Sequence, residues 1–348
     1  MINDLPSLDH VVVLSDDTGI IQHATYSVPN RSTGYCTDDV ARAFIVALMH
    51  HALHPGDPLP LRLASTYLSF LHDAQLPDGR FHNFMSYARG WLDDVGTHDS
   101  CGRAMWALGY GARFAPDATW RTLCAQMLDR ALPSLDWLEF PRAQAYALLG
   151  LHHAYSAAPR PLYRAAMERL AFSSLERLQR TAVAGWYWFE DIMTYDNARL
   201  PEALLLTGRS LASDAMVDAG LRTLDFLESV VFENGIFVPI GNDEWYRRGG
   251  VRARFAQQPL EAVAMVDAEL AAFDADERPE RLAAAARTQG WYHGANSLGV
   301  AIAVPGGGCC DGLDANGVNA NMGAESTLAY LASAYALALR QKQPSGAA

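Results

Sequence analysis

Apolar residues recur every three to four positions through most of the chain, and runs that alternate apolar and polar residues are few. Because a period near 3.6 is the signature of a helix with one buried face, this pattern predicts a mainly helical protein. The expected helices span residues 38–53, 60–74, 100–114, 119–138, 142–155, 161–180, 198–211, 214–231, 258–273, 279–288 and 323–339.

These helices alternate between two characters. One set is rich in alanine and apolar nearly all round, as in ARAFIVALMHHAL and STLAYLASAYALAL, and a helix of that kind must be buried on all sides. The other set is amphipathic and charged, as in LYRAAMERLAFSSLERLQR. The buried set recurs at a mean step of roughly 57 residues, the length of one helical hairpin with its loop. Six such helices predict an all-α fold, an (α/α)6 toroid with an inner and an outer ring.

We expect one toroid domain over residues 1–340 and a disordered tail, QKQPSGAA, over 341–348. A sixth outer helix is missing from the C-terminal end, so the segment from Leu8 to Leu14 either closes the ring or leaves it open. Runs such as GWYWFED and NGIFVPI predict short β-hairpins on one rim. Since the long loops gather at that rim, we expect the binding site there, at the mouth of the ring.

Composition narrows the classes of partner. Lys and Arg number 27 against 39 Asp and Glu, a net charge of −12, which repels the phosphates of nucleic acids and of anionic lipids. We therefore expect neither nucleic acid nor membrane as a partner. The start of the chain lacks the basic and apolar regions of a signal peptide, and no run approaches the roughly 18 apolar residues of a membrane span, so a cytoplasmic location is expected.

The five cysteines are scattered without C-x-x-C spacing, which favours reduced thiols over disulfides or a zinc knuckle. One alternative is a zinc site assembled from Cys101, Cys309, Cys310 and His98. We expect no metal. The chain also lacks phosphate-binding glycine motifs, a G-x-S-x-G elbow and H-E-x-x-H, so we expect no cofactor and find no support for a serine hydrolase or a zinc protease.

The junctions that lead into the inner helices hold most of the unusual polar residues. In GYCTDDVARA, Asp38 and Asp39 fall in the first helical turn and Arg42 in the next; each acid either complements the helix dipole or faces the cavity. In HDSCGRAMWALG, Asp99 is either a helix cap or a cavity carboxylate tuned by His98 or Arg103.

The fourth junction is the richest and combines aromatic rings with acids, an arrangement that suits sugar rings because their C–H faces stack on indoles while hydroxyls bond to carboxylates and amides. Its candidate residues are Trp186, Trp188, Phe189, Glu190, Asp191, Tyr195, Asp196, Asn197, Arg199 and Glu202. The third junction, DWLEFPRAQAYALLG, is quieter and offers Glu139 and Arg142. The last two junctions contribute Gln258 and Glu261, then Asp311, Asn321 and Glu325.

Cleavage of a glycosidic bond needs one protonated carboxyl for the leaving oxygen and one ionised carboxylate to activate water. The candidate acids for these two roles are Asp39, Asp99, Asp191, Glu261 and Glu325. We favour Asp191 as the acid, because GWYWF supplies an apolar wall. We favour Asp39 or Asp99 as the base, because a helix N-terminus stabilises an anion.

Several strings, among them GYCTDDVARA, HDSCGRAMWALG, WYWFEDIMTYDNARLPEALL, QQPLEA and GVNANMGAESTLA, resemble a family of bacterial (α/α)6 domains. Such domains occur alone or fused behind glycosyltransferase modules, often beside enzymes of mannoside metabolism. The resemblance covers nearly the whole chain and implies a carbohydrate-active toroid akin to helical glycoside hydrolases, with a functional link to a glycosyltransferase. Val40 departs from the pattern, where relatives more often carry Asn, whereas Asp38, Asp39 and Arg42 match it.

Three functions follow as hypotheses. The first is a glycoside hydrolase that acts on a small or linear glycoside, with mannosides among the candidates. The second is a sugar epimerase or isomerase on the same fold, in which histidines transfer protons; the candidates are His23, His82, His98 and His293. The third is a non-catalytic carbohydrate-binding module of a glycosyltransferase system. Acids outnumber histidines at the junctions, so hydrolysis ranks first. The pairs at 50–51 and 152–153 lie towards the far ends of inner helices and are expected to be structural.

Overall fold

The computed structural model describes residues 5–342, and helices dominate that part of the chain, as predicted. Its twelve α-helices are α1 (Asp9–Leu14), α2 (Thr37–Leu53), α3 (Leu59–Ala74), α4 (His98–Phe114), α5 (Ala118–Ala131), α6 (Pro141–Ala157), α7 (Pro161–Thr181), α8 (Arg199–Leu211), α9 (Asp214–Val231), α10 (Pro259–Asp276), α11 (Pro279–Gly290) and α12 (Ala324–Lys342). Two 3-10 helices, η1 (Arg31–Thr33) and η2 (Leu132–Trp137), lie between them.

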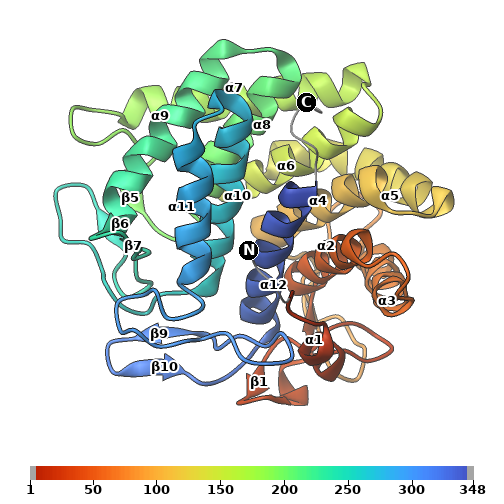
Figure 1. Cartoon of the computed structure of the whole chain (residues 1–348). Coiled ribbons are helices and arrows are strands. Elements are labelled where there is room, and N and C mark those ends of the chain that lie inside the picture. The colour runs from red at the N-terminus through yellow and green to blue at the C-terminus, as the bar shows by residue number, and fades with distance from the viewer. Residues whose placement is uncertain (1–4, 343–348) are drawn as a thin grey trace.

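The helices form two concentric rings (Figure 1). In the inner ring, α2, α4, α6, α8, α10 and α12 each pack against the next, and α12 packs back against α2, which closes the circle. The amphipathic helices α3, α5, α7, α9 and α11 follow the inner helices along the chain and pack outside them. The short helix α1 packs on α12. The predicted (α/α)6 toroid is confirmed, and the segment from Leu8 to Leu14 supplies the sixth outer element.

Two element boundaries differ from the prediction for local reasons. The helix expected over 119–138 is split into α5 and η2, because Pro133 stands at the start of η2 and its ring cannot continue the α-helical hydrogen bonds. Helix α12 extends to Lys342, so the first two residues of the expected tail are helical. The remainder of that predicted tail, 343–348, lies outside the described residues.

All ten strands lie in the connections that lead into inner helices, which confirms short strand pairs on one rim. They are β1 (Ala24–Thr25), β2 (Val28–Pro29), β3 (Tyr35–Cys36), β4 (Phe84–Met85), β5 (Ile192–Met193), β6 (Phe232–Glu233), β7 (Ile236–Phe237), β8 (Tyr246–Arg247), β9 (Gly312–Asp314) and β10 (Gly317–Asn319). The pairs β1–β2, β6–β7 and β9–β10 are antiparallel hairpins. The pairs β3–β4 and β5–β8 instead tie together loops that belong to different inner helices.

Glycines let two inner helices approach at backbone distance. A Cβ atom on Gly109 of α4 would overlap the carbonyl oxygen of Gly150 on α6, and one on Gly150 would overlap the carbonyl oxygen of Met105. This close approach brings Arg103 of α4 against Tyr146 of α6, with the guanidinium 2.7 Å from the phenol oxygen. Among residues 5–342, none of the helices is both long and apolar enough to cross a membrane.

Candidate active site

Charged side chains gather at the N-terminal ends of the inner helices, on the rim that carries the strands. Acids stand in the first turns of α2, α4, α8, α10 and α12, where the helix dipole favours an anion. Arginines stand there too: Arg142 and Arg199 in the first turns of α6 and α8, and Arg42 and Arg103 one turn deeper in α2 and α4. Because a cation opposes the dipole at this end, each arginine depends on acidic partners.

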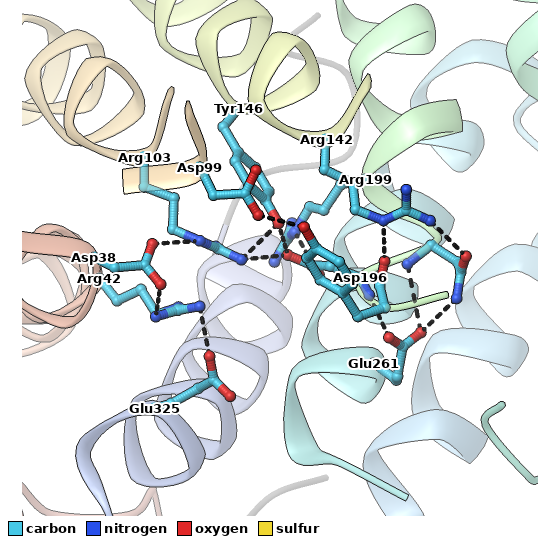
Figure 2. Close-up of polar contacts among 12 residues, drawn as sticks. Asp38, Arg42, Asp99, Arg103, Arg142, Tyr146, Asp196, Arg199, Glu261 and Glu325 are labelled. Atoms are coloured by element: carbon cyan, nitrogen blue, oxygen red, sulfur yellow. Dashed lines mark hydrogen bonds and ion pairs between the residues drawn. The ribbon is translucent and has the colours of Figure 1, made fainter. Parts of the chain in front are cut away.

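The first group of ion pairs links α12, α2 and α4 (Figure 2). Arg42 lies 2.7 Å from Glu325, 2.9 Å from Asp38 and 3.0 Å from Asp39. The other oxygen of Asp38 lies 2.7 Å from Nε of Arg103. Asp38 therefore bridges two guanidinium groups and joins α2 to α4, while the Arg42–Glu325 pair joins α2 to α12.

Arg103 continues the network towards α8. Its Nη2 donates to the phenol oxygen of Tyr146 at 2.7 Å and to Asp196 at 2.6 Å, and the Tyr146 hydroxyl also donates to Asp196 at 2.6 Å. Burial opposes ionisation of Asp196, but the charges of Arg103 and Arg199 outweigh it, so the pKa of Asp196 lies below its usual range. Asp196 is thus a buried anion at the centre of the network.

A second group surrounds Asp99. The Tyr195 hydroxyl donates to Asp99 at 2.5 Å, and the backbone of Tyr195 is held by Nε of Arg142. Arg142 also pairs with Glu190 at 2.7 Å and donates to Asn197 at 3.1 Å. Burial raises the pKa of Asp99, although the Tyr195 hydrogen bond and the charge of Arg103 oppose the rise. Asp99 therefore keeps its proton to a higher pH than an ordinary aspartate.

Two of the expected acids are buried behind the mouth. Asp39 accepts a hydrogen bond from the Cys36 thiol at 3.1 Å, and burial raises its pKa to about 7. Glu261 accepts from the backbone N–H groups of Asp196 and Asn197, just before α8, and burial raises its pKa to about 8. Glu261 thus satisfies backbone donors at the start of a neighbouring helix, a structural task that sequence reasoning did not foresee.

Three acids of the cluster remain open to a ligand. The side chain of Glu325 is 38% exposed and that of Asp38 is 23% exposed, while Asp99 is half-buried. Only one carboxylate oxygen of Glu325 contacts Arg42. Asp38, in contrast, contacts Arg42 with one carboxylate oxygen and Arg103 with the other.

The structure places Asp191 outside this cluster. Its side chain is 67% exposed and pairs with Arg248 at 3.0 Å, so the aromatic wall expected beside it is absent. Trp186 and Trp188 are buried in the core, and the indole N–H of Trp186 donates to the carbonyl oxygen of Glu190 at 2.8 Å. Neither indole offers a free face to a sugar, which differs from the stacking platform expected from the sequence.

The remaining expected residues surround the cluster without joining its ion pairs. His98 stacks on Trp137, with ring centroids 3.9 Å apart. Asp311 accepts from the backbone N–H of Gly323 at 2.8 Å, and Asn321 accepts from that of Tyr26 at 2.9 Å, so both brace the loop before α12. Gln258 immediately precedes α10 and makes no side-chain cap.

None of the histidines considered for proton transfer contacts Asp38 or Glu325, and His98, which directly precedes Asp99, stacks on Trp137. His82 contacts Asp93 at 3.1 Å, and His23 and His293 are exposed on loops. The pairs at 50–51 and 152–153 occupy the far ends of α2 and α6, as predicted. His50 contacts the Tyr335 hydroxyl at 2.9 Å and His152 the Ser210 hydroxyl at 2.7 Å.

Within residues 5–342, one group of side chains has ligand atoms close enough for a shared metal ion: Asp38, Asp39 and Glu325. Arg42 already pairs with all three, so its charge competes with any cation there. The alternative zinc set does not converge, since the thiols of Cys101 and Cys309 contact Ser134 and the backbone of Cys310 instead.

Arg199 lines an axial cavity of about 240 Å³, which Arg42 and Arg103 also border. Its Nη1 lies 2.6 Å from Glu202 and 2.8 Å from Asp267. Burial raises the pKa of Glu202 to about 8. Most of the cavity wall consists of apolar side chains from the inner helices, such as Met49 and Leu206.

Arg142, Asp196 and Glu202 stood among the residues that the junctions offered, but without an assigned role, and Tyr146 alone of the network was not foreseen. The position of Arg142 itself indicates an acidic partner, because an arginine in the first helical turn opposes the helix dipole. Tyr146 gave no signal, since it lies within an apolar stretch where a buried tyrosine is ordinary.

No protein-family model and no curated protein matches the chain. Several solved structures share its fold. Cellobiose 2-epimerase from Bacillus thermoamylovorans superposes with a TM-score of 0.75 at 11% identity, covering 97% of this chain and 96% of that one. The family 76 α-mannanase from Bacteroides thetaiotaomicron gives 0.66 at 11% identity, covering 96% and 94%.

The cellulase Cel9M of C. cellulolyticum gives a TM-score of 0.59 at 11% identity, covering 94% of this chain and 88% of that one. The three proteins carry out different reactions on carbohydrates, and each spans nearly the whole of this chain. At such identities the likeness extends to the fold. The chain therefore has the (α/α)6 toroid fold found in carbohydrate-active epimerases and glycoside hydrolases.

Proposed function

We propose that the protein is a glycoside hydrolase that cleaves a small or linear glycoside by carboxylate acid–base catalysis, with mannosides as the first sugars to test. One observation carries the proposal: the same mouth holds a half-buried acid whose pKa is raised, Asp99, and an accessible ion-paired carboxylate, Glu325. Glycoside cleavage requires one carboxyl group that donates a proton and a second that activates water.

In this proposal Asp99 donates a proton to the leaving oxygen. Its burial favours the protonated form, and Tyr195 fixes the orientation of the carboxyl group. Glu325 acts as the base, because it is the most exposed acid of the cluster and only one of its oxygens contacts Arg42, which leaves the other oxygen open to a water molecule. The proposal thus replaces Asp191 as the favoured donor, since the wall that motivated that choice is missing.

Epimerisation remains the second candidate, since cellobiose 2-epimerases share the fold. That reaction moves a proton on and off carbon next to a carbonyl, and histidine is well suited to it at neutral pH. None of the histidines in residues 5–342 forms an ion pair or a side-chain hydrogen bond with Asp38, Asp99 or Glu325. This absence favours hydrolysis. A link to a glycosyltransferase rests on the family resemblance and stays a prediction.

The proposal is tested by incubating the protein with manno-, gluco- and galacto-oligosaccharides in ¹⁸O-water and recording product masses. Hydrolysis yields shortened sugars that carry the heavy oxygen. We expect Asp99→Asn and Glu325→Gln each to lower the rate by roughly two to four orders of magnitude. Glu168→Gln, in an exposed ion pair of outer helix α7, is the control and leaves the rate unchanged.

Unchanged masses would contradict hydrolysis. The same panel in heavy water then separates the alternatives. Deuterium bound to carbon in the recovered sugar indicates epimerisation, whereas ligand-induced thermal shifts without any turnover indicate a binding module.

A further inference from the structure

Each guanidinium group that lines the mouth is paired with at least one acid of the same chain. Arg42 contacts three carboxylates. Arg103 contacts two, those of Asp38 and Asp196. Arg142 has Glu190, the side chain of Asn197 and a backbone carbonyl as partners. A phosphate or carboxylate on a ligand binds best to a guanidinium whose charge is not already compensated, and the charges of these three are each paired with an internal carboxylate.

The groups that face outward at the mouth are acidic. Glu325 and Asp38 keep part of their surface open to solvent, and Glu190 is exposed to the same extent as Asp38. Like charges within a few ångströms repel strongly where water is partly excluded. A ligand anion that entered would therefore meet carboxylates first, and behind them arginines that are already paired with acids.

We propose that this mouth accepts uncharged glycosides and rejects sugars that carry a phosphate or a carboxylate. The inference rests on the proposed function of the same site and narrows its substrate class. Hydroxyl groups suit the site because each can donate to a carboxylate oxygen without adding charge. Glu325 is the main determinant of this selectivity, since it is the most exposed acid of the three bonded to Arg42.

The experiment measures binding, so it does not depend on turnover. Mannose and methyl mannoside serve as neutral probes, and mannose 6-phosphate and mannuronate as anionic ones, each titrated by calorimetry at low and at physiological salt. We expect the neutral probes to bind with an affinity that salt does not change, and the anionic probes to bind at least about tenfold more weakly. Glu325→Gln frees one arm of Arg42, so we expect it to strengthen binding of mannose 6-phosphate about fivefold.

That gain in affinity must weaken with added salt, because screening acts on partly exposed charges. Asp38→Asn provides a second variant with the same expected direction, should Glu325→Gln fold poorly. Glu168→Gln changes the net charge equally but lies on an outer helix, and we expect no gain from it. An equal gain in Glu168→Gln would mean that overall charge, and not the mouth, rejects anions, and would overturn the inference.

The failures of the two proposals can be told apart. If the unmodified protein binds mannose 6-phosphate as tightly as mannose, selectivity for uncharged sugars is wrong while the proposed function stands. If neither the neutral nor the anionic probes bind, and no manno-, gluco- or galacto-oligosaccharide binds either, the proposed function fails and this inference fails with it.

Discussion

At the scale of single residues, burial and a hydrogen bond act in opposite directions on the pKa of Asp99. Burial raises its pKa, and the Tyr195 hydroxyl opposes the rise because it donates to the charged form. Tyr195→Phe removes only that hydroxyl. We expect the pKa of Asp99 to rise further, so that the alkaline limb of the pH–rate profile moves to higher pH.

The profile of kcat/KM against pH checks this prediction, since it reports the groups of the free enzyme. Tyr187→Phe serves as the control, because Tyr187 packs beside Arg222 on the outside of the ring. An alkaline limb that stays in place, or moves to lower pH, would mean that Asp99 is not the proton donor.

Arg103 is the residue on which the network depends most, because it touches Asp38, Asp196 and Tyr146 at once. Arg103→Ala removes the 2.6 Å ion pair of Asp196. The buried Asp196 anion then keeps only the longer ion pair with Arg199, at 3.5 Å. Removing one partner of a buried pair costs about 3–5 kcal/mol, and we expect that loss in urea unfolding. Arg164→Ala, in an exposed pair, should cost less than about 1 kcal/mol. Equal losses would show that the network carries no special stability.

The sequence predicted which residues stand at the mouth far better than what they do there. Asp38, Asp99 and Glu325 lie at helix starts, a position that the pattern of the chain reveals. Whether such an acid faces a ligand or satisfies a neighbouring backbone, as Glu261 does, depends on contacts between loops and helices distant in sequence. Trp188 illustrates the same limit, since an aromatic residue in a polar junction can equally well turn inward.

At the scale of elements, the contact between α4 and α6 holds Arg103 and Tyr146 in register. Gly150→Ala adds a methyl group that meets the backbone of Met105 and Trp106, so the helices must separate. We expect a loss of about 3 kcal/mol or more in the free energy of unfolding, as for other overpacked cores. The same displacement should weaken the pairing of Arg103 with Asp196.

Gly56→Ala is the matched control, because a Cβ there meets nothing within 4 Å and the added methyl group restricts the unfolded chain. We expect no loss of stability from it. Urea unfolding of both variants decides the matter. A Gly150→Ala protein as stable as the Gly56→Ala protein would show that α4 and α6 can move apart without cost.

The alternation of apolar and amphipathic helices was sufficient to predict the two rings, because burial on all sides dictates which helices are inside. Short strands were harder to predict. The hairpin at 232–237 follows from a local turn, whereas β5 pairs with β8 across more than 50 residues, and no local pattern records such a partner. Helix ends at prolines, as at Pro133, follow from the chain's own geometry.

At the scale of the whole molecule, the fold buries several acids that keep their protons. Burial raises the pKa of Asp39 to about 7 and the pKa values of Glu202 and Glu261 to about 8, whereas the unfolded chain ionises such groups near pH 4. Between about pH 4 and these folded pKa values, the folded protein binds more protons than the unfolded chain. Stability falls with rising pH wherever that holds, so the contribution of these acids is complete below about pH 4 and is lost above their folded pKa values.

Glu202→Gln isolates one of these groups, because the amide oxygen can still accept from Arg199 while no proton is at stake. Near pH 5 Glu202 is protonated in the fold and the variant should melt at the same temperature as the parent. At pH 9 the parent must ionise Glu202 inside the ring, so we expect the variant to melt about 2 °C higher or more. Thermal unfolding of both proteins from pH 5 to 9 measures the difference. A difference independent of pH would mean that Arg199 already holds Glu202 as an anion, and that the charge balance around Arg199 does not change across this range.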